Sequence, residues 1–265
     1  MPSARSLRHA LNVLEQRQQH VTVLLGVGNP LPVNTAPSSP AWRSLPNSKI
    51  ELEQISEQLN QETVYAFYEQ AATLTAILPH LSNATLLHLS CHGTFDASDI
   101  LGSGLQLADG MLTLRDLLDP TLYQLHHLRL AVLSACQTAI NDFADLPDES
   151  IGLPAGFLYS GAPGVVGSLW PVEDRATALL MRRFYHNFLD KKLEPAIALS
   201  EAQYWLRELT WKELGDYYRD IIIRMSASVA LQVYNQIVRP KIKPDPSGKP
   251  YENPYYWAGF TYTGV

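Results

Sequence analysis

The stretch Leu130-Ala-Val-Leu-Ser-Ala-Cys-Gln-Thr138 decides the fold. Its first residues form a short apolar run rich in branched aliphatic side chains, which is typical of a buried strand in a parallel sheet. The run ends in small and polar residues, and Cys136 is the first reactive side chain after it. In open α/β sheets, functional groups lie just beyond the carboxyl ends of the strands. Cys136 therefore stands where a nucleophile would be placed.

Other apolar segments of strand length surround this one and alternate with amphipathic segments of helix length. We expect strands at 21–26, 85–90 and 165–170, a hairpin around Asp109-Gly110, and a last strand within 254–262. We expect helices at 49–59, 64–81, 152–160, 174–189 and 194–209. Strands that alternate with helices predict an α/β fold, with a mostly parallel central sheet flanked by helices.

Length and composition favour one large globular domain. The 265 residues are 46% hydrophobic and 17% charged, and no internal repeat or second core is visible. Residues 1–20 are expected to form a helix that serves as a connector, and residues 21–265 the domain itself. No apolar run is long enough to span a membrane, and the first residues lack the apolar core of a secretory signal. We therefore expect a cytoplasmic protein with no membrane partner.

Charge and cysteine content exclude several other classes. The net charge of −6 argues against a dedicated nucleic-acid binder, which usually has a basic face. The two cysteines, Cys91 and Cys136, are not expected to form a disulfide in the cytoplasm. There is no CxxC motif and no zinc-type Cys/His spacing, so neither a metal nor a cofactor is expected.

A second strand end carries a histidine that could activate the thiol. His92 and Gly93 follow the predicted strand 85–90. A cysteine attacks a carbonyl as its thiolate, and an imidazole can act as the base at cytosolic pH. The N–H groups of Gly93 and of Cys136 itself are the candidate oxyanion donors. These residues together predict nucleophilic catalysis.

Other interpretations of the same residues remain open at this point. A cysteine at the end of a buried strand is often a small core side chain and a histidine there is often structural, so both Cys136 and His92 could be structural residues. Cys91 points to the opposite face of its strand from Ser90 and His92, and we interpret it as a core residue. His88, Cys91 and His92 make a poor metal site, because Cys91 faces the opposite side of the strand. Gly26 and Gly28 follow a strand, as in a flavodoxin-like nucleotide-binding domain, but the third glycine of the phosphate-binding motif is missing.

Five motifs in a fixed order resemble those of the CHAT domain family. Members of this family are caspase-like cysteine peptidases, distantly related to separase. Each motif alone is weak, and together they cover about residues 20 to 263. They are Ser-Cys-His-Gly-Thr-Phe (90–95), Leu-Ser-Ala-Cys-Gln-Thr (133–138), Gly-Leu-Pro-Ala-Gly-Phe-Leu (152–158), Gly-Ala-Pro-Gly-Val-Val-Gly-Ser-Leu-Trp-Pro-Val-Glu-Asp (161–174) and Pro-Tyr-Tyr-Trp-Ala-Gly-Phe (254–260).

The resemblance implies a caspase-like three-layer sandwich and an endopeptidase. His92 would be the general base and Cys136 the nucleophile. Several relatives cut after basic residues with the help of an acid near the rim of the site; here Asp174 is the counterpart and Glu173 its close competitor. A carboxylate in a partly dry pocket can hold an arginine fork. An alternative is that Asp174 caps the helix that follows it.

The resemblance also concerns partners. Members of the family are often fused to tetratricopeptide repeats, so an activating partner of that or another kind is implied beside the protein substrate. The helical segment near 210–250 is longer than expected of a minimal domain and is interpreted as an insertion. The alternative to a peptidase is a regulatory or scaffolding module of the same fold, catalytically silent or gated by a partner.

Overall fold

The computed structural model describes residues 21–32, 44–59, 62–94, 96, 98–119, 121, 125, 127–134, 152–221, 230–231, 234 and 245–265. The expected connector helix at 1–20 lies outside this set. Part of the expected insertion near 210–250 is described, namely the helix α8 (Trp211–Ile221). No helix among the described residues is long and apolar enough to cross a membrane.

A six-stranded sheet forms the centre of the molecule, in the order β2-β1-β3-β7-β8-β9. Neighbouring strands from β2 to β8 run parallel, and β9 pairs antiparallel with β8. The strands are β1 (Val23–Gly28), β2 (Thr63–Tyr68), β3 (Leu86–Ser90), β7 (Leu130–Leu133), β8 (Gly164–Ser168) and β9 (Phe260–Gly264). Because β1, β3, β7 and β8 are covered on both faces, their residues form nearly continuous apolar runs.

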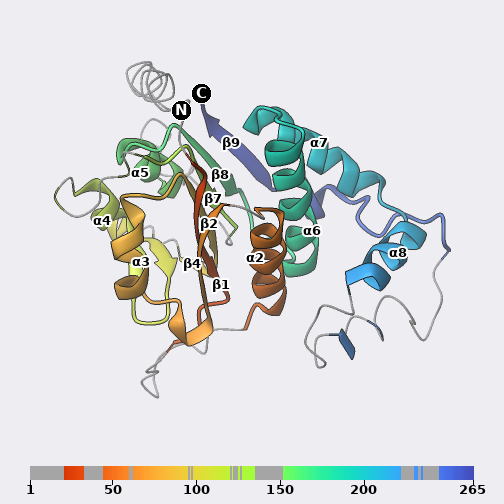
Figure 1. Ribbon diagram of the computed structural model, residues 1–265, viewed down its shortest axis with the longest axis horizontal. Helices are drawn as coiled ribbons and strands as arrows, with labels where there is room; N and C mark the ends of the chain where they lie inside the picture. Colours follow the sequence, from red (N-terminus) through yellow and green to blue (C-terminus); the bar gives the residue numbers. More distant parts are fainter. Residues whose placement is uncertain are drawn as a thin grey trace.

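Helices cover both faces of this sheet and make three layers (Figure 1). One core cluster joins the sheet to α2, α6, α7 and α8, and the other joins it to α3, α4 and α5. The helices are α2 (Pro46–Gln58), α3 (Leu74–Leu81), α4 (Leu114–Leu118), α5 (Leu153–Tyr159), α6 (Asp174–Tyr185) and α7 (Pro195–Glu208). A π-helical turn, His186–Asp190, continues α6.

A second, smaller sheet follows β3 in the chain. It consists of β4 (Gly93–Thr94), β5 (Gly104–Gln106) and β6 (Met111–Thr113), all antiparallel. Thr113 then caps α4, because its hydroxyl accepts from the Asp116 N–H and the Asp116 carboxylate accepts from the Thr113 N–H. The antiparallel pairing of β5 with β6 confirms the hairpin expected around Asp109-Gly110.

The helix expected over 64–81 is wrong. The structure divides this segment into the strand β2 and the shorter helix α3. The sequence Thr-Val-Tyr-Ala-Phe-Tyr (63–68) is rich in β-branched and aromatic residues, which suit a half-buried edge strand. Thr73 caps α3 by accepting from the Ala76 N–H, which fixes where the helix begins.

Gly26 and Gly28 serve packing in this fold. Both lie within β1, and α2 crosses directly over them. A Cβ atom at Gly26 would lie 2.3 Å from Leu52 Cδ1, and one at Gly28 would lie 3.1 Å from the Ser48 carbonyl oxygen. The two glycines therefore allow a helix to pack closely on the strand, in the place where a nucleotide-binding loop was considered.

Candidate active site

His92 lies between the two sheets, just beyond the carboxyl end of β3. Ser90 is the last residue of β3, and β4 begins at Gly93. The Gln106 N–H donates to the His92 carbonyl oxygen at 2.8 Å, which holds the His92 backbone against β5. His92 is half-buried.

The register of the central sheet relates His92 to the position of Cys136. Leu86, the first residue of β3, pairs with Leu130 of β7, and Leu89 pairs with Leu133, a constant offset of 44 positions. His92 and Cys136 are also 44 positions apart. The pairing that the structure describes ends at Leu89 and Leu133, three residues before His92 and Cys136. The equal spacing therefore supports an expectation that the two residues are near one another, and it is not a pairing seen in the sheet. Cys136 itself lies outside the described residues, which on this strand end at Ser134.

The Gly93 N–H points away from its neighbouring strand. In an antiparallel pair, hydrogen-bonded and non-hydrogen-bonded positions alternate. The bond from Gln106 to His92 makes that pair hydrogen-bonded, so Gly93, opposite Leu105, takes the non-hydrogen-bonded position. The Gly93 N–H is therefore directed away from β5, as a donor to an oxyanion would have to be.

Cys91 is a core residue, as its place on the strand predicts. It is 1% exposed and belongs to the core cluster on the α3–α5 side of the sheet. Its buried thiol takes part in no disulfide bond. Of the two cysteines, the structure thus removes Cys91 from the candidates for a nucleophile.

Glu173 and Asp174 follow β8 and have different contacts. Glu173 is the N-cap of α6, and its Oε2 accepts from the Ala176 N–H at 2.7 Å. Asp174 is the first residue of the helix, so the alternative that Asp174 caps α6 is wrong. Asp174 Oδ2 instead accepts two hydrogen bonds from Asn47, from its backbone N–H at 3.1 Å and from Nδ2 at 2.7 Å.

Asp174 thereby accepts hydrogen bonds from the first turn of another helix, α2. Asn47 lies in the first turn of α2, whose own N-cap residue, Leu45, offers no side-chain acceptor. Burial raises the pKa of Asp174, the hydrogen bonds from Asn47 lower it, and the charges of Glu51 and Glu173 raise it, leaving the pKa above its usual range. Oδ1 accepts no hydrogen bond from the described residues and remains available.

A buried polar network lies beneath this site and was not predicted. His88 Nε2 is 2.9 Å from Glu51 Oε1, and His88 Nδ1 is 3.2 Å from the Tyr185 hydroxyl. Ser90 Oγ donates to Glu51 Oε2 at 3.1 Å and contacts Ser48 Oγ, and all five side chains are buried. Burial, then the Glu51 charge, raises the pKa of Tyr185 well above its usual range, so the phenol stays protonated.

The network holds α2 onto the end of β3. Ser48 Oγ also donates to the Ser90 carbonyl oxygen at 2.9 Å, two residues before His92. Ser48 follows Asn47, so the first turn of α2 contacts both β3 and Asp174. One signal was present in the sequence: Ser48 and Glu51 share a helical face with Leu52 and Ile55, where apolar residues are expected.

Comparison with protein-family models identifies the family of this chain. The model of the CHAT domain family matches residues 1–265. The chain belongs to the CHAT domain family. Among curated proteins, none matches this chain.

Solved structures place this CHAT domain among the caspase-like folds. The crystal structure of the Arg-specific cysteine proteinase gingipain R has a TM-score of 0.50 and 10% sequence identity, over 72% of this chain and 43% of the gingipain chain. The complex of the RgpB pro- and mature domains from Porphyromonas gingivalis has a TM-score of 0.48 and 10% identity, over 71% and 44%. The match thus spans less than half of the gingipain chain. The predicted three-layer caspase-like fold is confirmed.

The candidate site of this CHAT domain therefore lies at the carboxyl ends of the central strands. The structure places His92, Gly93 and the Glu173–Asp174 pair after the carboxyl ends of β3 and β8, with the end of β7 between them. Across the described part of the chain, no group of three His, Cys, Asp or Glu side chains could hold a metal ion. The family and its solved neighbours support a cysteine-peptidase type of fold.

Proposed function

We propose that this CHAT domain is a cysteine endopeptidase that cleaves proteins after a basic residue. The observation that carries the proposal is the β3–β7 register, whose offset of 44 positions is also the spacing of His92 and Cys136. Membership of the CHAT family and the caspase-like fold add support.

In the proposed mechanism, the His92 imidazole takes the proton from the Cys136 thiol. The thiolate attacks the carbonyl carbon of the scissile peptide bond. The N–H groups of Gly93 and Cys136 donate to the oxygen, which becomes negatively charged. His92 then returns the proton to the leaving amine, and an acyl-enzyme remains on Cys136. Water, deprotonated by His92, attacks the acyl carbon and releases the second product together with the free thiol.

Asp174 is the proposed acid for the basic side chain of the substrate. Its Oδ2 is held by Asn47, while Oδ1 has no hydrogen bond from the described residues. A partly buried carboxylate oxygen gains a charge-assisted hydrogen bond from arginine or lysine. Glu173 is the weaker candidate, because its carboxylate already caps α6. Gingipain R, which shares the fold, is described as Arg specific, so arginine is the side chain to test first.

An arginyl acyloxymethyl ketone tests the proposal directly. We expect this covalent probe to label the wild-type chain and Cys91→Ala, but neither Cys136→Ala nor His92→Ala. Cys91→Ala is the matched control, because it removes the other thiol of the chain from a buried position. Labelling of Cys136→Ala, or a wild-type chain that stays unlabelled with and without candidate activating partners, would contradict the peptidase proposal and favour a scaffolding module.

A further inference from the structure

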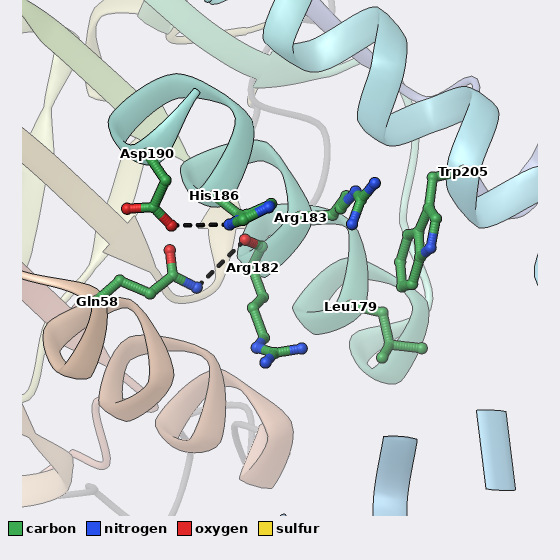
Figure 2. Close-up of a pocket in the computed structure, with 7 residues that line it drawn as sticks. All are labelled: Gln58, Leu179, Arg182, Arg183, His186, Asp190 and Trp205. Atoms are coloured by element: carbon green, nitrogen blue, oxygen red, sulfur yellow. Dashed lines mark hydrogen bonds and ion pairs between the residues drawn. The ribbon is translucent and has the colours of Figure 1, made fainter. Parts of the chain in front are cut away.

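A cavity lies between α2, α6 and α7, away from the candidate active site. Its volume is about 380 Å³, within the range of small-molecule sites. Seven residues of these helices and of the π-helical turn line it: Gln58, Leu179, Arg182, Arg183, His186, Asp190 and Trp205. Figure 2 shows the Arg182 and Arg183 side chains leaving α6 in different directions, with Arg183 toward Trp205. Asp174 begins α6, whereas the cavity lies toward the last turns of that helix, so the two sites are at opposite ends of α6.

Two neighbouring arginines give this cavity its charge. Arg182 and Arg183 are consecutive on α6, and neither lies within 4 Å of a carboxylate among the described residues. Burial, followed by the charge of Arg182, lowers the pKa of Arg183, and the more distant Glu201 acts in the opposite direction. A guanidinium remains charged at any physiological pH, so two residues that line this cavity carry a positive charge.

Aromatic rings hold both guanidiniums in place. Arg182 Cζ is 4.6 Å from the centre of the Tyr217 ring, and Arg183 Cζ is 5.3 Å from the Trp205 ring. Tyr217 lies on α8, and its hydroxyl donates to Gln54 Oε1 of α2 at 2.9 Å. This hydrogen bond holds the Tyr217 ring against α2. Stacking of this kind orients a guanidinium by its face and leaves its N–H edge for hydrogen bonds.

The remaining polar groups of the cavity form no ion pair with either arginine among the described residues. Asp190 Oδ2 is 2.7 Å from His186 Nδ1, so this carboxylate is already paired. Gln58 Nε2 donates to the Arg182 carbonyl oxygen at 3.4 Å. Gln58 Oε1 and Arg183 Nε are buried and have no hydrogen-bond partner in the part of the chain that the structure describes. The π-helical turn His186–Asp190, a feature common at functional sites, brings the His186–Asp190 pair to the cavity.

We propose that this cavity binds a small phosphate-bearing anion. Phosphate oxygens accept paired hydrogen bonds from a guanidinium fork, and a multiply charged anion would neutralise Arg182 and Arg183 together. Arg183 Nε would gain the acceptor it lacks. The volume exceeds what inorganic phosphate needs and fits a phosphorylated small molecule or a short polyphosphate. Sodium tripolyphosphate is the probe for this chemistry.

Isothermal titration calorimetry at constant ionic strength tests the proposal with the full chain. We expect one saturable site for tripolyphosphate in the wild type, with affinity at least about tenfold lower in Arg182→Gln and in Arg183→Gln, because each removes hydrogen bonds between charged groups. Arg115→Gln is the matched control. It removes the same charge from an exposed arginine on α4, across the sheet, and should bind like the wild type.

Four results would overturn the proposal. They are no saturable binding by the wild type, an equal loss in Arg115→Gln, wild-type affinity in either Arg182→Gln or Arg183→Gln, and citrate binding as tightly as tripolyphosphate. Circular dichroism establishes that each variant is folded. If Arg183→Gln does not fold, Arg183→Lys replaces it: this variant keeps the charge but loses the planar fork, and undiminished affinity in it would also overturn the proposal.

Discussion

Asn47 donates two hydrogen bonds to a single carboxylate oxygen of Asp174, although the two residues are 127 positions apart in the chain. One donor is the backbone N–H in the first turn of α2, and the other is the side-chain amide. The acid proposed to recognise the substrate is thus anchored by a helix from the other end of the domain sequence. The shared oxygen leaves Oδ1 for a second partner.

Asn47→Ala tests whether this anchor matters for recognition. It removes the 2.7 Å bond from Nδ2 and keeps the backbone donor. Loss of one hydrogen bond to a partly buried carboxylate should lower the free energy of unfolding by about 1–2 kcal/mol. With an arginyl peptide substrate, we expect KM to rise several-fold while kcat changes little, because the proposed role of Asp174 is to bind the substrate side chain and not the reacting atoms. Urea denaturation and steady-state kinetics measure the two effects.

The control for Asn47→Ala is Asn83→Ala, an exposed asparagine beyond the end of α3 on the opposite face of the sheet. It should leave both stability and KM at wild-type values. Asn47→Asp sharpens the stability test by placing a like charge against Asp174, so it should lower the free energy of unfolding further at neutral pH. A fall in kcat with an unchanged KM in Asn47→Ala would contradict the proposed role of Asp174.

Asp174→Asn should change how stability depends on pH. Burial raises the pKa of Asp174 in the folded protein above the ordinary value of 3.8. The folded state therefore binds the proton of the Asp174 carboxyl more tightly than the unfolded state does. The stabilisation that this proton gives the folded state is fully present below about pH 4 and is lost as the pH rises through the folded pKa. Asparagine has no proton to lose. The stability of the variant relative to wild type should consequently increase from pH 4 to pH 7.

Urea denaturation at several pH values measures this difference. Comparing the two chains at each pH cancels the other groups that titrate over the same range, among them Glu53, whose pKa is also raised by burial. A stability difference that stays constant from pH 4 to pH 7 would show that the folded pKa of Asp174 is ordinary.

The sequence was sufficient to predict the strands at the centre of the sheet. β3, β7 and β8 are buried on both faces and consist of apolar runs, so they stand out in a single sequence. β2 does not, because an edge strand is half-exposed and its polar and apolar residues also suit a helix. Only pairing with β1 separates it from the helix that follows.

The candidate site likewise has a part that the sequence predicts and a part that it does not predict. His92 and Gly93 follow a strand directly, so their location could be predicted from local sequence. The partners of Asp174 could not, because Asn47 reaches it only when α2 and α6 pack side by side on one face of the sheet (Figure 1). The same packing brings Glu51 to His88 and Tyr185, which no local pattern relates.

Gly26→Ala tests the close packing of α2 on the sheet. The added methyl group would meet Leu52 Cδ1 at 2.3 Å, and both residues lie in the core between α2 and β1. Overpacking of this kind costs about 1–3 kcal/mol. Gly110→Ala is the control, because a Cβ there would meet no atom within 4 Å, so its unfolding free energy should change by no more than about 0.5 kcal/mol. Equal stability of the two variants would mean that Leu52 moves aside freely.

Glu51→Ala tests the buried network beneath the site. It removes the carboxylate that lies 2.9 Å from His88 Nε2 and accepts the hydrogen bond of the Ser90 hydroxyl, and leaving a buried polar group without its partner costs about 1–3 kcal/mol. Lys49→Ala is the control on the same helix: it breaks an exposed pair with Glu69, 3.5 Å apart, which should cost at most about 1 kcal/mol. Urea denaturation distinguishes these values. If the two variants lose similar amounts, the Glu51 carboxylate does not stabilise the packing of α2 on β3, which the Ser48 hydrogen bond and apolar contacts would then hold.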